Sequence, residues 1–273
     1  MNETGILQKM KVELADPVHY SLVLGDQHLA VNPMIGHTVK LSFTGKIYCI
    51  HCGRHTKKSF SQGYCYPCFR DLAQCDMCIV KPEQCHYDQG TCREPEWGES
   101  FCMQPHYIYL ANSSGIKVGI TRHTQIPTRW IDQGAISALP IIKVSSRYLS
   151  GLVEIHLKQY VSDTTSWQKM LKGLVEPVDL LAKRTELLQL SAEFFDTLSE
   201  RLGEQVIELL QDREPVHISY PVTQYPGKVK SFNFDKTPEV EGLLEGIKGQ
   251  YLIFDTGVIN IRKFGGYQIK VEC

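Results

Sequence analysis

The sequence predicts an α+β protein, and three observations support this prediction. Short β-rich runs separated by turn residues occupy both ends of the chain. A cysteine-rich stretch follows the first of them, with nine of the ten cysteines between Cys49 and Cys102. The middle of the chain alternates strand and helix patterns in the order strand, strand, helix, strand, helix. With 273 residues, there is room for one large domain or two to three small ones at ~150 residues per domain.

These patterns divide the chain into five segments. A small β meander covers residues 1–45, and a Cys-rich, zinc-ribbon-like region covers 46–106. In residues 107–172, YIYLA and IKVGIT predict a hairpin around the turn NSSG, followed by a short helix in IPTRWIDQGA, a strand in LPIIKV and a longer helix in RYLSGLVEIHLKQYV. Residues 173–214 form an amphipathic helical segment, with apolar residues every three or four positions from Lys183 to Asp212 and an interruption at Gly203. Residues 215–273 form a small β domain that the N-terminal meander could complete.

The composition excludes several classes of protein. Hydrophobic residues make up 42% of the chain and charged residues 22%, which excludes collagen-like, low-complexity and wholly disordered chains. No uncharged apolar run approaches ~18 residues, so we expect no membrane-spanning helix. The first residues, MNETGILQKMKVELAD, contain three acids and no apolar block of signal-peptide length, so we expect a cytoplasmic protein.

The net charge of -1 hides segments of opposite sign. Residues 46–70 carry a net charge of +5 and residues 107–172 another +5, whereas 71–106 and 173–214 are acidic. Basic segments on a neutral chain could bind phosphate locally. Lys57, Lys58 and Arg122 are candidate phosphate contacts and Trp130 is a candidate stacking surface, so nucleic acid, DNA or RNA, is the expected partner.

Two Cys-x2-Cys knuckles predict a metal site. Cys49 and Cys52 are followed after twelve residues by Cys65 and Cys68, an arrangement typical of a zinc ribbon. Paired turns of this kind bring four sulfurs to ~2.3 Å from one tetrahedral zinc ion. In a reducing compartment, a dense cluster at such spacings more often binds metal than forms disulfides. Because four protein ligands saturate the ion, the predicted zinc is structural.

A second metal site is predicted from the cysteines that follow. The favoured ligand set is Cys75, Cys78, Cys85 and Cys92. Two alternatives for its second half stay open, Cys92 with Cys102, or the Cys102-x3-His106 pair. An iron–sulfur cluster also uses four thiolates, but the lack of a longer Cys-x2-Cys-x2-Cys run favours zinc. We therefore expect about two structural zinc ions per chain, without which the region should unfold.

Residues 107 to about 165 resemble a degenerate GIY-YIG nuclease module. The motifs behind the resemblance are Tyr107-Ile108-Tyr109, Lys117-Val118-Gly119-Ile120-Thr121, Arg129-Trp130 and Glu154 within LVEIHLK. The resemblance implies a three-stranded antiparallel sheet with flanking helices. It also implies that Tyr109 acts on the attacking water, Arg129 neutralises the phosphate and Glu154 holds one divalent cation, Mg²⁺ or Mn²⁺. Phosphodiester hydrolysis needs these three functions.

The sequence departs from the module in three places. Tyr107 stands where the first motif has glycine, Lys117 replaces the second motif's tyrosine, and Arg129 lies at a longer spacing. Lys117 could contact phosphate instead, and its presence favours a second class of function. In that class the protein is a non-catalytic binder or adaptor that docks on nucleic acid, the ribosome or a protein partner, and Glu154 forms an ion pair with Lys158 one helical turn away.

The whole chain is also similar to an uncharacterised bacterial family known only as a domain of unknown function. The similar segments include CGRHTKKSFSQGYCYPCF, GTCREPEWGESFC, KVGITRHTQIPTRWIDQGA and GIKGQYLIFDTGVINIRKFGGY. That family supplies no activity. The sequence therefore predicts a zinc-binding, nucleic-acid-interacting bacterial protein which, if it is an enzyme, is a divalent-metal-dependent phosphodiester hydrolase of GIY-YIG type.

Overall fold

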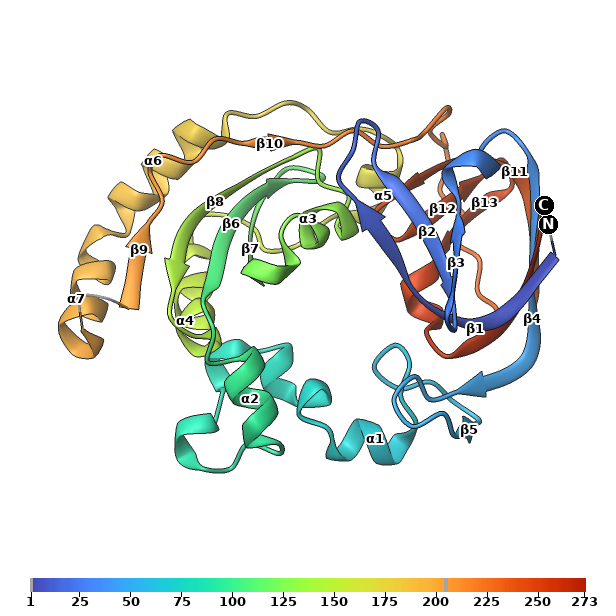
Figure 1. Ribbon diagram of the computed structural model, residues 1–273. Helices are drawn as coiled ribbons and strands as arrows, with labels where there is room; N and C mark the ends of the chain where they lie inside the picture. The colour runs from blue at the N-terminus through green and yellow to red at the C-terminus, as the bar shows by residue number, and fades with distance from the viewer. Residues whose placement is uncertain (1, 204–205) are drawn as a thin grey trace.

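The computed structural model describes residues 2–203 and 206–273, and its backbone forms two antiparallel β-sheets (Figure 1). The larger sheet lies on the right of the view and the smaller one on the left. The Cys-rich segment runs between them along the lower edge, so the chain forms a ring in this projection. The predicted α+β class is confirmed.

Strands from both ends of the chain build the nine-stranded sheet. Its order is β13-β12-β11-β4-β14-β1-β2-β3, with β5 paired to β4. The bounds are β1 Asn2–Glu13, β2 His19–Leu24, β3 Gln27–Ala30, β4 Thr38–Tyr48, β5 His55–Thr56, β11 Glu239–Lys248, β12 Tyr251–Phe254, β13 Gly257–Asn260 and β14 Tyr267–Glu272. The last strand, β14, lies between β1 and β4, with Ile6 opposite Gln268 and Leu41 opposite Val271. The N-terminal meander and the C-terminal strands thus share one sheet.

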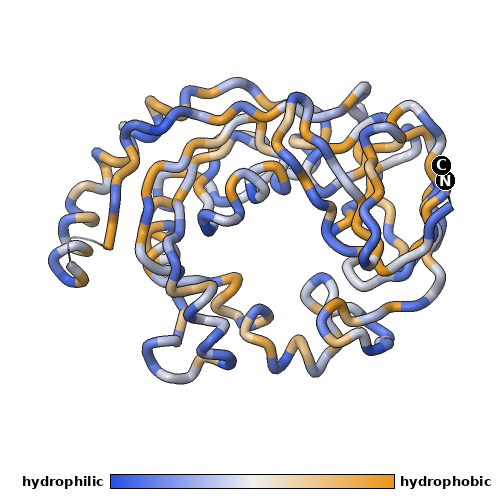
Figure 2. Tube along the Cα trace, viewed as in Figure 1, coloured by the Kyte–Doolittle hydropathy of each residue, from blue (hydrophilic) through white to orange (hydrophobic). Residues whose placement is uncertain are grey.

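Alternating apolar side chains hold this sheet to the core. In β14, Tyr267, Ile269 and Val271 are buried, and the residues between them are partly exposed. This period of two is what a strand with one buried face requires. The same core includes Tyr109 and Trp130 from the middle of the chain, so the two sheets pack through one continuous apolar cluster. Figure 2 shows apolar residues, in orange, recurring along the strands of both sheets.

The smaller sheet has the order β10-β8-β6-β7, and β9 pairs with β8. Its strands are β6 His106–Asn112, β7 Ile116–Arg122, β8 Ser137–Val144, β9 Ile207–Leu209 and β10 Val216–His217. The hairpin of β6 and β7 and the third strand β8 occur where the sequence predicts them. Strands β9 and β10 extend the expected three strands to five.

Helices cover the small sheet and link the remaining strands. They are α1 Tyr66–Asp71, α2 Pro95–Phe101, α3 Thr128–Asp132, α4 Arg147–Leu157, α5 Trp167–Leu171, α6 Leu180–Leu190 and α7 Ala192–Leu202. Helix α4 begins where the Ser146 hydroxyl accepts a hydrogen bond from the Leu149 amide at 3.4 Å. Its buried residues Leu149, Val153 and Leu157 recur every four positions and belong to the second core, under the small sheet. Among the described residues, no helix is long and apolar enough to cross a membrane.

The long amphipathic helix expected between Lys183 and Asp212 is instead two helices and a strand. Helix α6 ends before Ser191, and α7 ends at Leu202 because Gly203 has a φ of 101°. Two residues of the expected helix, 204–205, lie outside the described residues. Residues 207–209 form β9 because the edge of β8 offers them backbone hydrogen bonds. The apolar period holds only in part, since Leu187 and Leu198 are buried in the second core and Phe194 and Val206 pack against it. Three other apolar positions of the predicted period are exposed, namely Leu190, Leu202 and Leu209.

Candidate functional site

The two Cys-x2-Cys knuckles bring their four sulfurs together. The Sγ atoms of Cys49, Cys52, Cys65 and Cys68 all lie within 4.8 Å of one another, and Cys52 and Cys65 are 3.8 Å apart. Cys49 follows β4, and Gly53, with a φ of 70°, turns the first knuckle. The other pair lies at the start of α1. Four thiolates in this arrangement could hold a metal ion, and their chemistry fits zinc.

The ionisation of these cysteines also suits a cation. Burial opposes ionisation of Cys49, but hydrogen bonds from the backbone of Cys52, Cys65 and His51 lower its pKa to about 6. Burial and hydrogen bonds with the three neighbouring sulfurs raise the pKa of Cys68. A second negative charge beside the first is unfavourable unless a cation lies between them. A divalent ion would remove this conflict and allow all four sulfurs to ionise.

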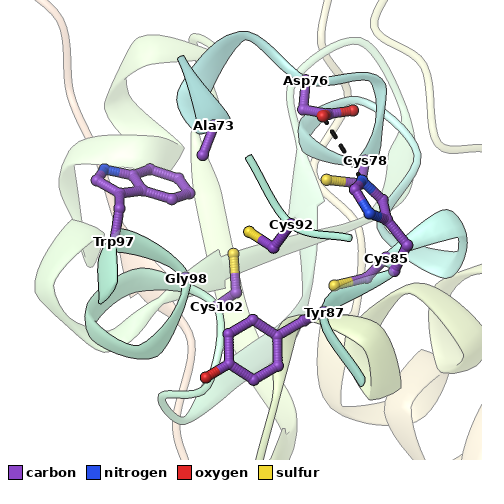
Figure 3. Close-up of a pocket in the computed structure, with 10 residues that line it drawn as sticks. Ala73, Asp76, Cys78, Cys85, Tyr87, Cys92, Trp97, Gly98 and Cys102 are labelled. Carbon is purple, nitrogen blue, oxygen red and sulfur yellow. Dashed lines mark ion pairs between the residues drawn. The ribbon is translucent and has the colours of Figure 1, made fainter. Parts of the chain in front are cut away.

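The second cysteine cluster differs from the favoured prediction. Cys78, Cys85 and Cys92 of the favoured set line one small pocket, but Cys75 does not line it. Its thiol is buried, and its charged neighbours include Arg93 and Cys49 of the first cluster. Cys102 is the fourth cysteine of the pocket (Figure 3). Cys75 and Cys78 therefore do not face the same pocket, although they form a Cys-x2-Cys pair. They lie on separate 3-10 turns, Ala73–Cys75 and Met77–Ile79.

His106, an open alternative as a ligand, does not line that pocket. It is the first residue of β6 and is fully buried. Its Nδ1 lies 2.7 Å from the Gln104 carbonyl oxygen, to which it can donate. Burial lowers the pKa of His106 to about 4, so its ring is neutral at neutral pH.

A separate cavity of about 730 Å³ lies where the two sheets and the Cys-rich segment meet. Its walls come from β1, β7, α3, α4, the Cys-rich segment and the 3-10 helix Ile261–Phe264. Six basic and three acidic residues line it, so the walls carry excess positive charge, which concentrates anions. The basic residues are Lys9, Lys117, Arg122, Arg129, Arg147 and Arg262, and the acidic ones are Asp132, Glu154 and Asp163.

The three residues assigned to catalysis from the sequence gather around this cavity, together with the candidate phosphate contact Lys117. Lys117 on β7, Arg129 on α3 and Glu154 on α4 line it directly. Tyr109 on β6 is fully buried behind them, and its hydroxyl donates a 3.0 Å hydrogen bond to Oε1 of Gln133, which also lines the cavity. Strand β6 pairs with both β7 and β8, and this pairing brings the elements that carry the four residues together.

Close packing fixes the phenol of Tyr109. A Cβ on Gly119, its partner across the hairpin, would lie 2.6 Å from the Tyr109 oxygen, so glycine is required there. The Trp130 ring packs edge-on at 6.0 Å. Burial raises the pKa of Tyr109, the charge and hydrogen bonding of Arg129 oppose this rise, and the charge of Glu154 adds to it. Tyr109 therefore remains a neutral phenol at neutral pH.

Lys117 is 5% exposed, and its Nζ donates a 3.2 Å hydrogen bond to the Thr165 hydroxyl. Burial lowers the pKa of Lys117 to about 8, and the charge of Arg129 adds to this effect. The charges of Asp163 and Glu154 oppose it. A lysine with this pKa is partly a neutral amine just above neutral pH, and a neutral amine can accept a proton.

Glu154 belongs to a small charged group on the cavity wall. Its side chain is 15% exposed, and Oε2 lies 3.6 Å from Lys158 Nζ. The ion pair expected for a non-catalytic binder or adaptor is therefore present. Lys158 is closer to Asp163, at 2.8 Å. Burial raises the pKa of Glu154, and the charge of Lys158 opposes that rise. A partly buried carboxylate in a long ion pair would be stabilised by a divalent cation.

The residues assigned to nucleic-acid binding occupy three environments. Lys57 and Lys58 are exposed between the two knuckles. Arg122 lines the cavity, with its guanidinium 4.4 Å from the centre of the Phe101 ring. Trp130 is only 2% exposed and belongs to the shared core, so its ring cannot stack on a base and that prediction is wrong. Neighbouring helical residues point in different directions, so Arg129 reaches the cavity while Trp130 enters the core.

Sequence reasoning missed three basic residues of the cavity. Arg147 begins α4, Arg262 donates from Nε to the Gln62 side chain at 2.7 Å, and Lys9 forms an ion pair with Asp132. Arg262 and Lys9 reach the cavity because the two ends of the chain join one sheet. No local motif marks either residue. The only local signal that marks Arg147 is its position as the first residue of a helix.

The fold and these sites define a mixed α+β protein with a possible four-cysteine metal site and a basic cavity between two antiparallel sheets. The chain belongs to the family described as "Protein of unknown function (DUF2797)", whose model matches residues 36–269. A search of curated proteins found no match, nor did a search of solved structures. The matched range includes both cysteine clusters and every cavity residue except Gln8 and Lys9.

Proposed function

We propose that this protein is a zinc-binding, nucleic-acid-interacting protein that hydrolyses phosphodiesters in the basic cavity, as a divalent-metal-dependent nuclease of GIY-YIG type. The observation behind the proposal is that Lys117, Arg129 and Glu154 line one cavity beside the Tyr109 hydroxyl. The element order of β6, β7, α3, β8 and α4 supports it, because it is the order on which the resemblance to that module rests.

The polar groups of the cavity suit the charge that develops during hydrolysis. Water attacks phosphorus, a new P–O bond forms, and the bond to the leaving oxygen breaks to give a phosphomonoester and an alcohol. The guanidinium of Arg129 would stabilise the negative charge on the phosphoryl oxygens. Glu154 would hold the divalent cation, which neutralises further charge and orients the phosphate when bound.

Tyr109 and Lys117 would share the handling of the attacking water. The buried phenol of Tyr109 keeps its proton and donates a hydrogen bond to Gln133, which lines the cavity, so its role would be to position the Gln133 side chain that orients the water. The amine of Lys117, with a pKa of about 8, would accept the proton that the water loses. Lys117 thus replaces the motif tyrosine with a group of different chemistry.

Zinc has a structural role in this proposal. The four-cysteine cluster would fix the first part of the Cys-rich segment, from which Ser61, Gln62 and Tyr64 line the cavity. A tetrahedral zinc ion with four thiolates has no open position for water, so zinc would not take part in hydrolysis.

A cleavage assay tests the proposal. Purified protein is incubated with Mg²⁺ or Mn²⁺ and a panel of single- and double-stranded DNA and RNA. We expect divalent-dependent cleavage that falls at least about 100-fold in Glu154→Gln, while binding is retained. The control is Glu186→Gln, which removes a helical glutamate paired with Lys183 at 2.8 Å on α6, outside the cavity. If the wild-type protein leaves the whole panel intact, the nuclease proposal is wrong.

A second candidate is non-catalytic binding, and two observations favour it. Lys117 replaces the motif tyrosine, and Lys57 and Lys58 are exposed on the Cys-rich segment, outside the cavity. In this case the protein would bind nucleic acid or dock on the ribosome or a protein partner without cutting. Salt-sensitive binding that is lost in a Lys57/Lys58 double alanine variant, with no cleavage of the panel, would favour this candidate.

A further inference from the structure

The pocket in Figure 3 lies between 3-10 turns of the Cys-rich segment and helix α2. Its volume is about 10 Å³, close to the ~10–15 Å³ that one water-sized sphere needs. Four cysteine side chains line it, and in the close-up their sulfurs lie around its centre. A void of this size surrounded by sulfur is suited to a single metal ion rather than to an organic ligand.

We propose that Cys78, Cys85, Cys92 and Cys102 hold a second structural zinc ion. This ligand set differs from the one that the Cys-x2-Cys spacing favours, since Cys102 replaces Cys75. It also goes beyond the proposed function, because the site needs no nucleic acid and takes no part in hydrolysis.

The packing around the pocket brings the four cysteines onto the same small void. A Cβ on Gly98 of α2 would meet the Tyr87 ring at 2.9 Å and the Cys92 sulfur at 3.4 Å, so glycine lets the helix approach closely. Cys102 directly follows α2, and its amide donates to the Gly98 carbonyl at 2.7 Å. The helix thereby places the Cys102 sulfur against the pocket.

Positive charge lies where a zinc tetrathiolate would need it. Four thiolates and Zn²⁺ carry a net charge of about -2. The Arg147 guanidinium donates from Nη2 to the Ile79 carbonyl at 2.6 Å and is close enough to interact with the thiols of Cys78, Cys85 and Cys102. Because the Arg147 amide also donates to the Cys102 carbonyl at 2.8 Å, the proposed ion would hold the start of α4 against the Cys-rich segment.

A competing ligand set is Asp76, Cys78 and His86, whose ligand atoms lie within 4.8 Å of one another. The carboxylate of Asp76 is already paired with Arg93 Nε at 2.7 Å. The imidazole of His86 is engaged at both nitrogens, with Thr91 at 2.7 Å and with Asp76 at 3.5 Å. Asp76 and His86 already have polar partners within the protein. They therefore lie beside Cys78 without binding the ion, which binds the four sulfurs instead.

Metal stoichiometry of single variants tests this ligand set. Elemental analysis should give about two zinc ions per wild-type chain and about one in Cys102→Ser. The matched control Cys75→Ser and the variant His86→Asn should each retain two. The proposal is overturned if the wild type holds one ion, if Cys102→Ser keeps two, or if either of the other variants loses one.

Cobalt substitution of the wild-type protein covers the case in which a variant fails to fold. With two Co²⁺ ions bound, the sulfur-to-cobalt charge-transfer absorption should correspond to four thiolates per ion. A second ion whose absorption corresponds to a single thiolate would identify the Asp76, Cys78 and His86 set and refute the four-cysteine site.

Discussion

At the scale of single residues, burial sets the chemistry of the cavity. Tyr109 and Lys117 are both buried, and burial moves their pKa values in opposite directions, up for the phenol and down for the amine. As a result, the phenol keeps its proton and the amine can release its own near pH 8. This division gives each group a definite role in the proposed hydrolysis.

The first prediction tests the phenol. Tyr109→Phe should lower the cleavage rate at least about 100-fold, because it removes the hydroxyl that holds Gln133 in position to orient water. The free energy of unfolding should fall by only about 1 kcal/mol, since one hydrogen bond to Gln133 is lost. Tyr107→Phe on the same strand is the matched control, because Tyr107 lies outside the cavity beside His123. Equal activity of the two variants would remove Tyr109 from the mechanism.

The second prediction concerns Lys117 and pH. Its folded pKa of about 8 lies below the ordinary 10.5, so between these values the unfolded chain binds more protons and stability rises with pH. From about pH 7 to about pH 9.5 this group should add about 2 kcal/mol of stability. In Lys117→Met the added stability should be absent. Urea unfolding of both proteins at several pH values measures the difference, and parallel pH profiles would contradict a lowered pKa.

At the scale of secondary structure elements, helix α4 joins the cavity to the Cys-rich segment. It carries Glu154, and it passes so close to that segment that a Cβ on Gly151 would lie 2.4 Å from the Glu83 amide nitrogen and 2.8 Å from the Pro82 carbonyl carbon. Backbone atoms cannot move aside as a flexible side chain can. The contact therefore requires glycine in the middle of a helix.

The third prediction follows from this contact. Alanine normally stabilises a helix interior by about 1 kcal/mol relative to glycine, but Gly151→Ala should destabilise the protein by about 1–3 kcal/mol because of the backbone clash. Gly227→Ala is the control, since nothing lies within 4 Å of its Cβ position and the change should stay within about 0.5 kcal/mol. Denaturant unfolding measures both, and a stabilised Gly151→Ala would disprove the close contact.

Local patterns predicted those elements whose structure depends on neighbouring residues. The β6–β7 hairpin, α3, β8 and α4 follow from turn residues and apolar period, and the first knuckles follow from their spacing. Strand β9 was missed because its stability comes from pairing with β8, far away in the sequence. Cys102 was left as one of several options because spacing alone does not tell how 3-10 turns point their side chains. Arg262 was missed because only the sheet topology brings it to the cavity.

At the scale of the whole molecule, the Cys-rich segment connects the two sheets. It runs from the end of β4 in the large sheet to the start of β6 in the small one. Its helices, α1 and α2, have six and seven residues, too short to be stable without other support. Metal binding would supply that support.

The fourth prediction is that metal removal opens this segment. After treatment with a chelator, limited proteolysis should cut within residues 50–105, while the two sheets resist longer because their cores are large. Nucleic-acid binding should fall in parallel, because residues of this segment line the cavity. Re-addition of zinc should restore both properties, and a chelated protein that resists protease as before would argue against a structural metal.

The central claim is that the cavity between the two sheets binds a phosphodiester. A crystal structure with a phosphorothioate oligonucleotide and Mn²⁺ tests it most directly, because the slow-cleaving backbone and the anomalous signal of manganese locate phosphate and cation. We predict a phosphate within hydrogen-bonding distance of Arg129 and manganese coordinated by Glu154. An oligonucleotide bound only on the outer surface, with neither group in the cavity, would contradict the account.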